Sequence, residues 1–316
     1  MIKWMLPLLC GYLSGCMVVE SVAVKATGGL LQKGAKEIET EGNWQLFKTA
    51  APGNIKMAEG LLYTDKENLD ILAVLTKAYA GYAYGVDETL YLAEKLGDKD
   101  HKPNLQRAVT SYSKAVQYGL KYFELSSLKF DQIIKNAKDG TLNNYLDSHL
   151  DNKNSRDVET AFFTAQAWAG LINLQKQNTQ LIGQIYLAKA IVDWVCRDYP
   201  DIQQGACYIA DGMYHLSRPK MLGGKPKLGK KAFFDGFKKF PSNLLIKVAY
   251  IEYYVIPAMD EDEFKKQRSL IRDAIKKSKI SYIPGAKSEQ SKEGRLLNAI
   301  AKRRFHIINK YEKDIF

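Results

Sequence analysis

Residues 69–82, LDILAVLTKAYAGY, carry the clearest secondary-structure signal in the chain. Their apolar side chains recur every three or four residues, which gathers them into one stripe along a helix that can be buried. The same spacing continues through most of the chain after residue 36, and no sustained alternation of apolar and polar residues between hairpin turns occurs. The sequence therefore predicts an all-α protein.

Turn-forming residues divide this helical pattern into segments. Predicted breaks lie at Pro52-Gly53, Gly97-Asp98, Asp139-Gly140, Pro200, Gly223-Gly224, Pro241 and Pro284-Gly285. Between them, Leu72–Tyr84, Ala161–Leu174 and Gly205–Leu216 are predicted helices. Asp260, followed by Glu263, predicts a capped start for another helix through Phe264–Lys276.

A repeated spacing follows three of the predicted helices. In a tetratricopeptide (TPR) repeat, the second helix carries a small residue, a ring or branched residue four later and a small residue three after that. Small residues let two helices approach closely, and the ring fills the groove beside them. The spacing occurs at Ala108-Tyr112-Ala115, Ala188-Val192-Val195 and Gly229-Phe233-Gly236. It predicts a TPR-like helical-hairpin solenoid with degenerate repeats and long inserts, at 84–104 and 125–160.

The first residues resemble a secretion signal. Lys3 gives a positive start, and the apolar run Met5–Leu13 is far shorter than the roughly 20 residues of a membrane-spanning helix. Small residues then precede Cys16, as at a lipoprotein cleavage site. We expect a signal peptide over residues 1–15, a lipid on Cys16, a flexible lipidated tether over 16–40 and a TPR-like helical domain over 41–316. Met17, where an Asp would favour inner-membrane retention, favours the outer membrane over the inner one.

The charge balance is basic, with 46 Lys and Arg against 35 Asp and Glu and a formal net charge of +11. An exported chain meets little nucleic acid, so anionic lipid or an acidic partner is the simpler explanation. Basic clusters such as 276–279 and Lys302-Arg303-Arg304 are interpreted as solvated helix faces. The four histidines lie outside metal-ligand spacing, and no catalytic signature occurs. We expect no catalytic site, cofactor or metal.

Of the four cysteines, Cys10 lies in the expected signal peptide and Cys16 is the expected lipid site. Two cysteines remain. Cys196 and Cys207 lie on either side of a predicted turn, so antiparallel helices could bring them together. An oxidising periplasm permits a disulfide. Both also lie among apolar residues, where free cysteines are common, so a disulfide and two buried thiols remain alternatives.

Aromatic residues are the strongest candidates for a binding surface. The chain has 19 Tyr and 12 Phe, spread over the predicted helices. Most are expected to fill grooves between helices, and some to line a concave groove, where tyrosine offers a flat face and one hydrogen-bonding tip. The candidate groove aromatics are Tyr79, Tyr82, Trp168, Tyr208, Tyr214, Tyr250 and Tyr253.

The chain resembles the TRAP-transporter-associated TPR lipoproteins, the TatT or T-component family. The resemblance covers roughly residues 40–280 and rests on packing and turn motifs: Asn43–Phe47 with Ala51-Pro52, Leu72–Tyr84, Ala161–Phe163 with Ala167–Ala169, Leu222–Pro226, Phe233–Phe240, and Tyr250–Tyr254 with Asp260 and Phe264. It implies a periplasm-facing, lipid-anchored helical protein that forms a homotrimer.

The resemblance also implies a partner, the periplasmic solute-binding protein of a TRAP-type transporter, which imports organic acids or apolar ligands. The leading hypothesis is a scaffold that docks this protein and aids ligand delivery or uptake. An envelope-assembly TPR scaffold and a carrier of a hydrophobic small molecule are the alternatives. A hydrolase on a helical scaffold would need a catalytic acid, and the sequence nominates none.

Overall fold

The computed structural model describes residues 27–277 and 294–316, and in these residues it is helical with no strand. The expected signal peptide and Cys16 lie outside the described residues. The prediction of an all-α protein is confirmed for the part of the chain described. No helix in these two ranges is both long and apolar enough to span a bilayer.

The first half of the fold contains the three longest helices, α2, α5 and α8. A helix at residues 27–38 is followed by α2 (Trp44–Thr64), α3 (Leu69–Tyr82), a π-helix η1 (Ala83–Glu88), α4 (Thr89–Leu96), α5 (Pro103–Leu125), α6 (Phe130–Lys138), α7 (Leu142–Asp147) and α8 (Ser155–Leu174). The inserts predicted between the repeats are therefore themselves largely helical.

The second half contains helices of up to 17 residues. They are α9 (Thr179–Ile182), α10 (Ile185–Asp198), η2 (Ile202–Gln204), α11 (Ala206–Leu216), η3 (Lys220–Leu222), α12 (Pro226–Lys239), α13 (Leu244–Tyr250), a second π-helix η4 (Ile251–Val255), α14 (Glu261–Lys277), α15 (Arg295–Lys310) and α16 (Glu312–Ile315). Asp260 Oδ1 accepts a hydrogen bond of 3.0 Å from the Glu263 amide, so the cap predicted for α14 is confirmed.

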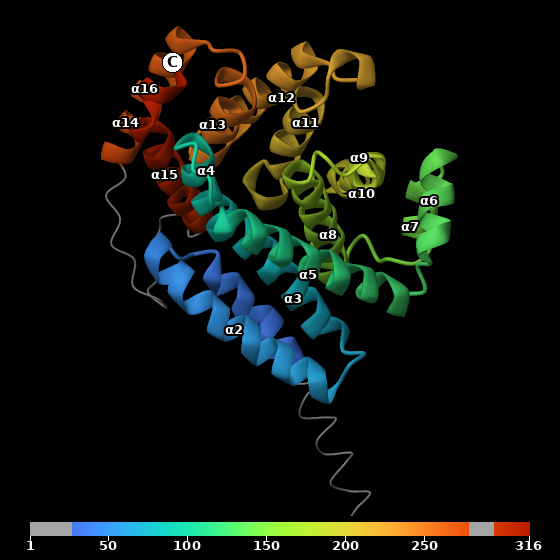
Figure 1. Ribbon diagram of the computed structural model, residues 1–316. Helices are drawn as coiled ribbons and strands as arrows, with labels where there is room; N and C mark the ends of the chain where they lie inside the picture. The colour runs from blue at the N-terminus through green and yellow to red at the C-terminus, as the bar shows by residue number, and fades with distance from the viewer. Residues whose placement is uncertain (1–26, 278–293) are drawn as a thin grey trace, which may run out of the picture.

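Successive long helices pack against one another along the chain. Contacts run from α2 to α3, α5, α8, α10, α11, α12 and α13 in order, as expected for helical hairpins stacked side by side. The last long helix, α15, packs on α13 and also on α4 and α2, so the end of the array returns to its beginning (Figure 1).

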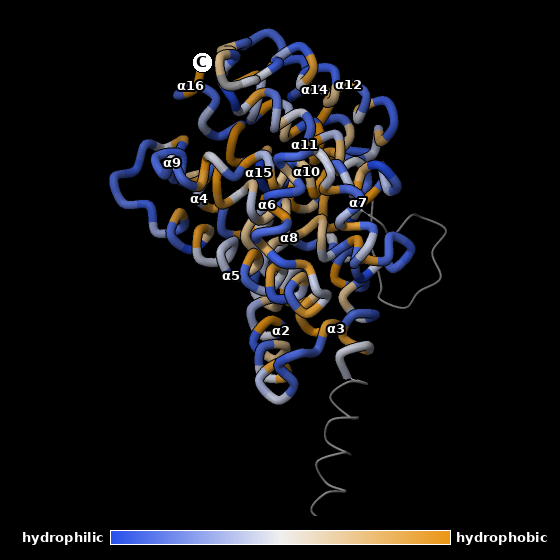
Figure 2. Tube along the Cα trace, turned by 90° about the vertical axis from the view of Figure 1, so that its right-hand side faces the viewer, coloured by the Kyte–Doolittle hydropathy of each residue, from blue (hydrophilic) through white to orange (hydrophobic). Residues whose placement is uncertain are grey.

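The interior divides into two main hydrophobic cores. One lies among α2, α3 and α5 to α10, and the other among α11 to α15 with Leu92, Ala93 and Leu96 of α4. Helix α11 contributes to both, with Ala206 and Ala210 on the first and Ile209 and Met213 on the second. Figure 2 shows hydrophobic residues gathered between the helices and hydrophilic residues on the outer turns. The region where the two cores meet contains the cavity described below.

The small and ring residues of the three repeat-like spacings are all buried. At Gly229, an added Cβ would lie 2.9 Å from the carbonyl oxygen of Gly212, so glycine lets α12 approach the backbone of α11. This agrees with the packing reason given for the spacing. The relation to TPR repeats itself stays a prediction.

The break predicted at Pro52-Gly53 is wrong, because α2 continues through both residues. A proline inside a helix removes one N–H and leaves the carbonyl four residues earlier without its usual donor. That carbonyl belongs to Lys48, and the Tyr82 hydroxyl donates to it at 3.4 Å. The neighbouring helix α3 thus supplies a tertiary hydrogen bond in place of the missing one.

The structure differs from the flexible tether expected over residues 16–40 in residues 27–40. Residues 27–38 form a helix, and the segment that follows is bound to α15. The Leu296 amide donates to the Glu39 carbonyl at 3.0 Å, and Arg295 Nε donates to the Thr40 carbonyl at 2.9 Å. These contacts fix residues 39 and 40 to a distant part of the chain. From its composition alone, the segment before them is expected to be flexible.

Candidate functional site

A cavity of about 1330 Å³ lies between the two cores. Helices α2, α3 and α8 of the first half, and α10, α11 and α15 of the second, all contribute to its wall. Its lining is predominantly apolar and includes Phe162, Phe163, Met213, Leu297 and Ile300. This volume exceeds the roughly 300–1,000 Å³ typical of small-molecule sites, so the cavity can hold a long apolar molecule.

One edge of the cavity exposes apolar side chains to solvent. Leu30 and Ile38 of the first helix are 68% and 37% exposed, and Leu46 and Met57 of α2 are 52% and 51% exposed. All four also line the cavity. We call these four residues the apolar rim. Side chains that both line a cavity and meet solvent mark its opening, and exposed apolar patches commonly bind partners.

The cavity wall is polar at Glu88, which is only 6% exposed. The Tyr112 hydroxyl donates to Glu88 Oε2 at 2.5 Å, and Arg304 Nη2 donates to Oε1 at 3.3 Å. Tyr84, Tyr112 and Tyr253 line the cavity as well. We call Glu88 and these three tyrosines the polar end.

Arg304 lies behind the polar end and is not part of the cavity wall. Its Nε and Nη2 donate to the two Glu252 oxygens at 2.8 and 2.5 Å, and its Nη1 donates to the Tyr84 carbonyl and the Thr89 hydroxyl. The interpretation of Arg304 as part of a solvated face is wrong, because the residue is 1% exposed. A basic triplet does not reveal which of its members faces the core.

Burial and charge shift the pKa values of these groups in opposing ways. Burial raises the pKa of Glu88, against the opposing effects of Arg304 and Tyr112. Burial alone would lower the pKa of Arg304, but Glu252, Tyr84 and Glu88 raise it well above its ordinary value. Arg304 therefore stays cationic.

Two π-helices place these residues. Tyr84 and Glu88 belong to η1, and Glu252 and Tyr253 belong to η4. A π-turn inserts one residue into a helix, which rotates the following side chains by about 100° relative to an α-helix. The Gly85 carbonyl of η1 accepts a 2.7 Å hydrogen bond from Trp44 Nε1. π-Helices frequently occur at functional sites.

Two of the seven candidate groove aromatics, Tyr214 and Tyr253, line the cavity. The other five lie elsewhere. Tyr250 is completely buried against Phe233, and Trp168 is buried with its Nε1 donating to Gln184 at 3.1 Å. The Tyr79 hydroxyl donates to Glu59, the Tyr82 hydroxyl to the Lys48 carbonyl, and Tyr208 packs beside Phe240. The structure does not gather the seven residues into one surface.

Sequence reasoning did not single out Glu88, Tyr84 or Tyr112 as site residues. Tyr112 did carry a signal, because it is the ring of the first repeat-like spacing. Glu88 carried none, since a lone acid within a helical segment is usually solvated. Its position on the cavity wall depends on η1 and on the approach of α5 and α15.

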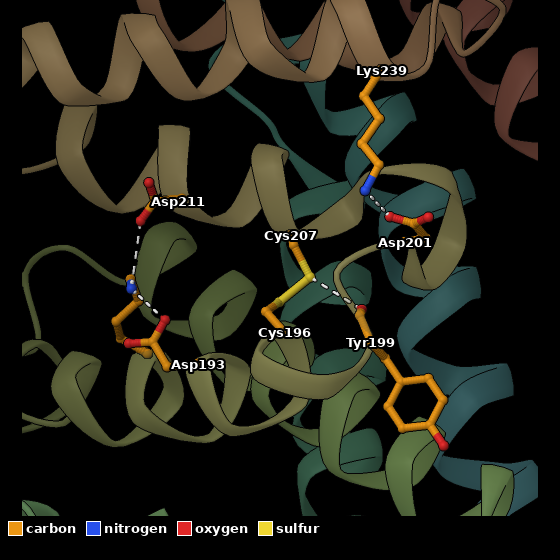
Figure 3. The surroundings of a disulfide bond; sticks show 8 residues. Asp193, Cys196, Tyr199, Asp201, Cys207, Asp211 and Lys239 are labelled. Carbon is orange, nitrogen blue, oxygen red and sulfur yellow. Dashed lines mark hydrogen bonds and ion pairs between the residues drawn. A yellow bond between two sulfur atoms is a disulfide. The ribbon is translucent and has the colours of Figure 1, made fainter. Parts of the chain in front are cut away.

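Cys196 of α10 and Cys207 of α11 are joined by a disulfide in the structure, with their Cα atoms 5.9 Å apart (Figure 3). Both helices line the cavity. Ion pairs lie nearby. Lys189 pairs with Asp193 and Asp211, and Figure 3 shows the pair of Lys239 with Asp201. The disulfide therefore links two neighbouring elements of the cavity wall.

Within the residues described, no group of three or more His, Cys, Asp or Glu side chains is arranged to hold a metal ion. Residues 40–316 match the family described as TAtT, TRAP transporter T-component. No curated protein sequence matches the chain significantly.

Proposed function

The chain belongs to the TRAP transporter T-component family, and from this premise we propose that it is a lipid-anchored periplasmic scaffold for TRAP transport. In this proposal it docks the solute-binding protein of a TRAP-type importer and aids ligand delivery or uptake. Cys16 carries the lipid, with the outer membrane favoured, and the protein is a homotrimer. Intact mass of membrane-extracted protein tests the anchor, and light scattering tests the trimer. The family is a transport component rather than an enzyme family.

The observation that carries the docking proposal is the apolar rim at the cavity opening. A partner seated there would cover apolar side chains that are now in water. It would also place its own ligand site next to an apolar cavity, so a ligand could pass between the two proteins without crossing solvent. A scaffold without ligand transfer would need no cavity behind its docking surface.

Charged substitutions in the rim test the docking surface. We expect Leu46→Glu and Met57→Glu each to weaken binding of the host's TRAP solute-binding protein by about tenfold or more, because an unpaired charge would be buried at the interface. Binding is measured by calorimetry with the chain from Met17. All contacts described above lie within residues 27–316, so this chain retains them.

Tyr63→Glu is the matched control, since Tyr63 lies on the same helix, is 79% exposed and does not line the cavity. It should bind like the unaltered chain. Equal affinities for all three variants would contradict docking at the rim. Absence of binding by the unaltered, folded chain would reject the transport role in favour of an envelope-assembly scaffold.

The cavity supports a second role, which is to hold an apolar molecule. Gly81 of α3 lines the cavity, and an added Cβ there would meet no atom within 4 Å. We expect Gly81→Trp to weaken binding of a long-chain amphiphile such as decylamine by at least about tenfold, because the indole occupies ligand space. Folding should be preserved, since glycine inside a helix is itself unfavourable.

Gly60→Trp is the control for this substitution. Gly60 lies in the interior of α2, its added Cβ also meets no atom within 4 Å, and it does not line the cavity. Binding is followed by calorimetry and folding by circular dichroism. If Gly81→Trp binds decylamine as tightly as Gly60→Trp does, the cavity is not the binding site.

A further inference from the structure

Glu88 is a surplus carboxylate on the wall of a predominantly apolar cavity. The closest partner of Arg304 is Glu252, with bonds of 2.8 and 2.5 Å, whereas Glu88 receives only a 3.3 Å bond from the same guanidinium. One guanidinium thus faces two carboxylates. Glu252 takes the larger share of the positive charge, and Glu88 is the one that lines the cavity.

The groups around Glu88 suit a head group that donates hydrogen bonds. The Tyr112 hydroxyl is already committed as a donor to Glu88. The Tyr253 hydroxyl accepts a 3.4 Å hydrogen bond from Asn173 Nδ2. The Glu88 oxygens keep further lone pairs that can accept hydrogen bonds from a ligand, and the tyrosine rings present faces that attract cations. A carboxylate head would bring a second negative charge to the same place.

The cations that line the cavity are Lys77, Lys176, Lys189 and Arg218. Arg218 donates to the carbonyls of Tyr214 and Gly223. Lys77 pairs with Glu39 and Glu159, and Lys189 pairs with Asp193 and Asp211. Lys176 lines the cavity too, but it is an exposed residue. Solvent and salt screen an exposed charge far more than a buried one. At the polar end, Glu88 is thus the charged side chain that lines the cavity.

We propose that the polar end selects amphiphiles whose head group donates hydrogen bonds and carries no negative charge, and that Glu88 excludes carboxylates. The inference rests on the proposed role of the cavity in holding an apolar molecule. It gives Glu88 a specificity role: the apolar wall binds the chain of the ligand, and the surplus carboxylate decides which head groups can enter. Fatty acids are excluded by the same charge, so the cavity serves the apolar rather than the acidic ligands named above.

Three probes of equal chain length test the proposal: decylamine, decanol and decanoate, each titrated calorimetrically at neutral pH into the chain from Met17. The amine and the carboxylate carry charges of equal size, so their comparison removes the general cost of burying a charge. We expect decanoate to bind at least about tenfold more weakly than decylamine, because like charges repel at a desolvated contact.

Glu88→Gln is the deciding variant, since its amide oxygen can still accept from Tyr112 while the charge is removed. We expect the difference between decylamine and decanoate to shrink to a few-fold at most. Lys176→Gln should leave the order of the probes unchanged. Circular dichroism verifies that both variants are folded.

Two results would overturn the proposal: equal binding of decanoate and decylamine by the unaltered chain, or a preference that survives Glu88→Gln. Strong decanoate binding that disappears in Lys176→Gln would assign the site to Lys176 instead. If none of the probes binds, the cavity role and the head-group selection fail together. Docking of the solute-binding protein is measured separately and would stand.

Discussion

Replacing Arg304 by methionine is expected to lower the free energy of unfolding by about 3–5 kcal/mol, the usual cost of removing one partner from a buried ion pair. The substitution would leave Glu88 and Glu252 buried and facing each other without a cation. It would also leave the Tyr84 carbonyl without the hydrogen bond from Arg304 Nη1. Urea unfolding monitored by circular dichroism measures the loss.

The pH dependence of this variant identifies the cause of its instability. Burial already raises the pKa of Glu88, and loss of the guanidinium should raise it further. A carboxyl whose pKa is higher in the folded than in the unfolded state stabilises the fold at low pH, and this stability is lost as the pH rises. The deficit of the variant should therefore be smaller near pH 5 than near pH 8.

Two further variants control for the loss of a side chain. Arg272 is exposed and donates to Asn309 at 2.9 Å, so Arg272→Met should change stability little. The triple variant Arg304→Met, Glu88→Gln, Glu252→Gln should recover part of the loss, because no unpaired charge is buried. A deficit independent of pH and unchanged in the triple variant would contradict this account.

Removal of the disulfide is the second large expected effect. We expect Cys196→Ser with Cys207→Ser to lower the free energy of unfolding by about 3 kcal/mol, because the variant loses a crosslink that restricts the unfolded chain. A longer closed loop would give a larger effect. The two cysteines are 11 residues apart. Urea unfolding with and without reductant measures the effect, and intact mass shows whether the two thiols are bonded.

The double variant also serves as the internal control. Reductant should destabilise the unaltered chain and leave the double variant unchanged. If the unaltered chain is insensitive to reductant and its mass shows two free thiols, the cysteines act as buried apolar side chains. The sequence left this alternative open.

Local patterns were sufficient to predict several of the helices. The apolar spacing at 69–82 became α3, the predicted segment at 161–174 lies within α8, and Asp260 caps α14. These features depend on neighbours within a few residues, which the sequence displays directly. Pro52 shows the limit of such reasoning, because the hydroxyl that compensates it comes from Tyr82 on another helix.

The sequence by itself determined that the chain is helical, where several helices end, and which small residues would be buried. Only the tertiary structure decided that Glu88 and Tyr253 line a cavity, that Tyr250 does not, and that Arg304 is buried. The physical reason is rotational. A helix can turn its faces only as its packing partners allow, and each π-helix shifts the following side chains by about 100°. Neither the packing partners nor these shifts can be read from residues within one helical turn of each other.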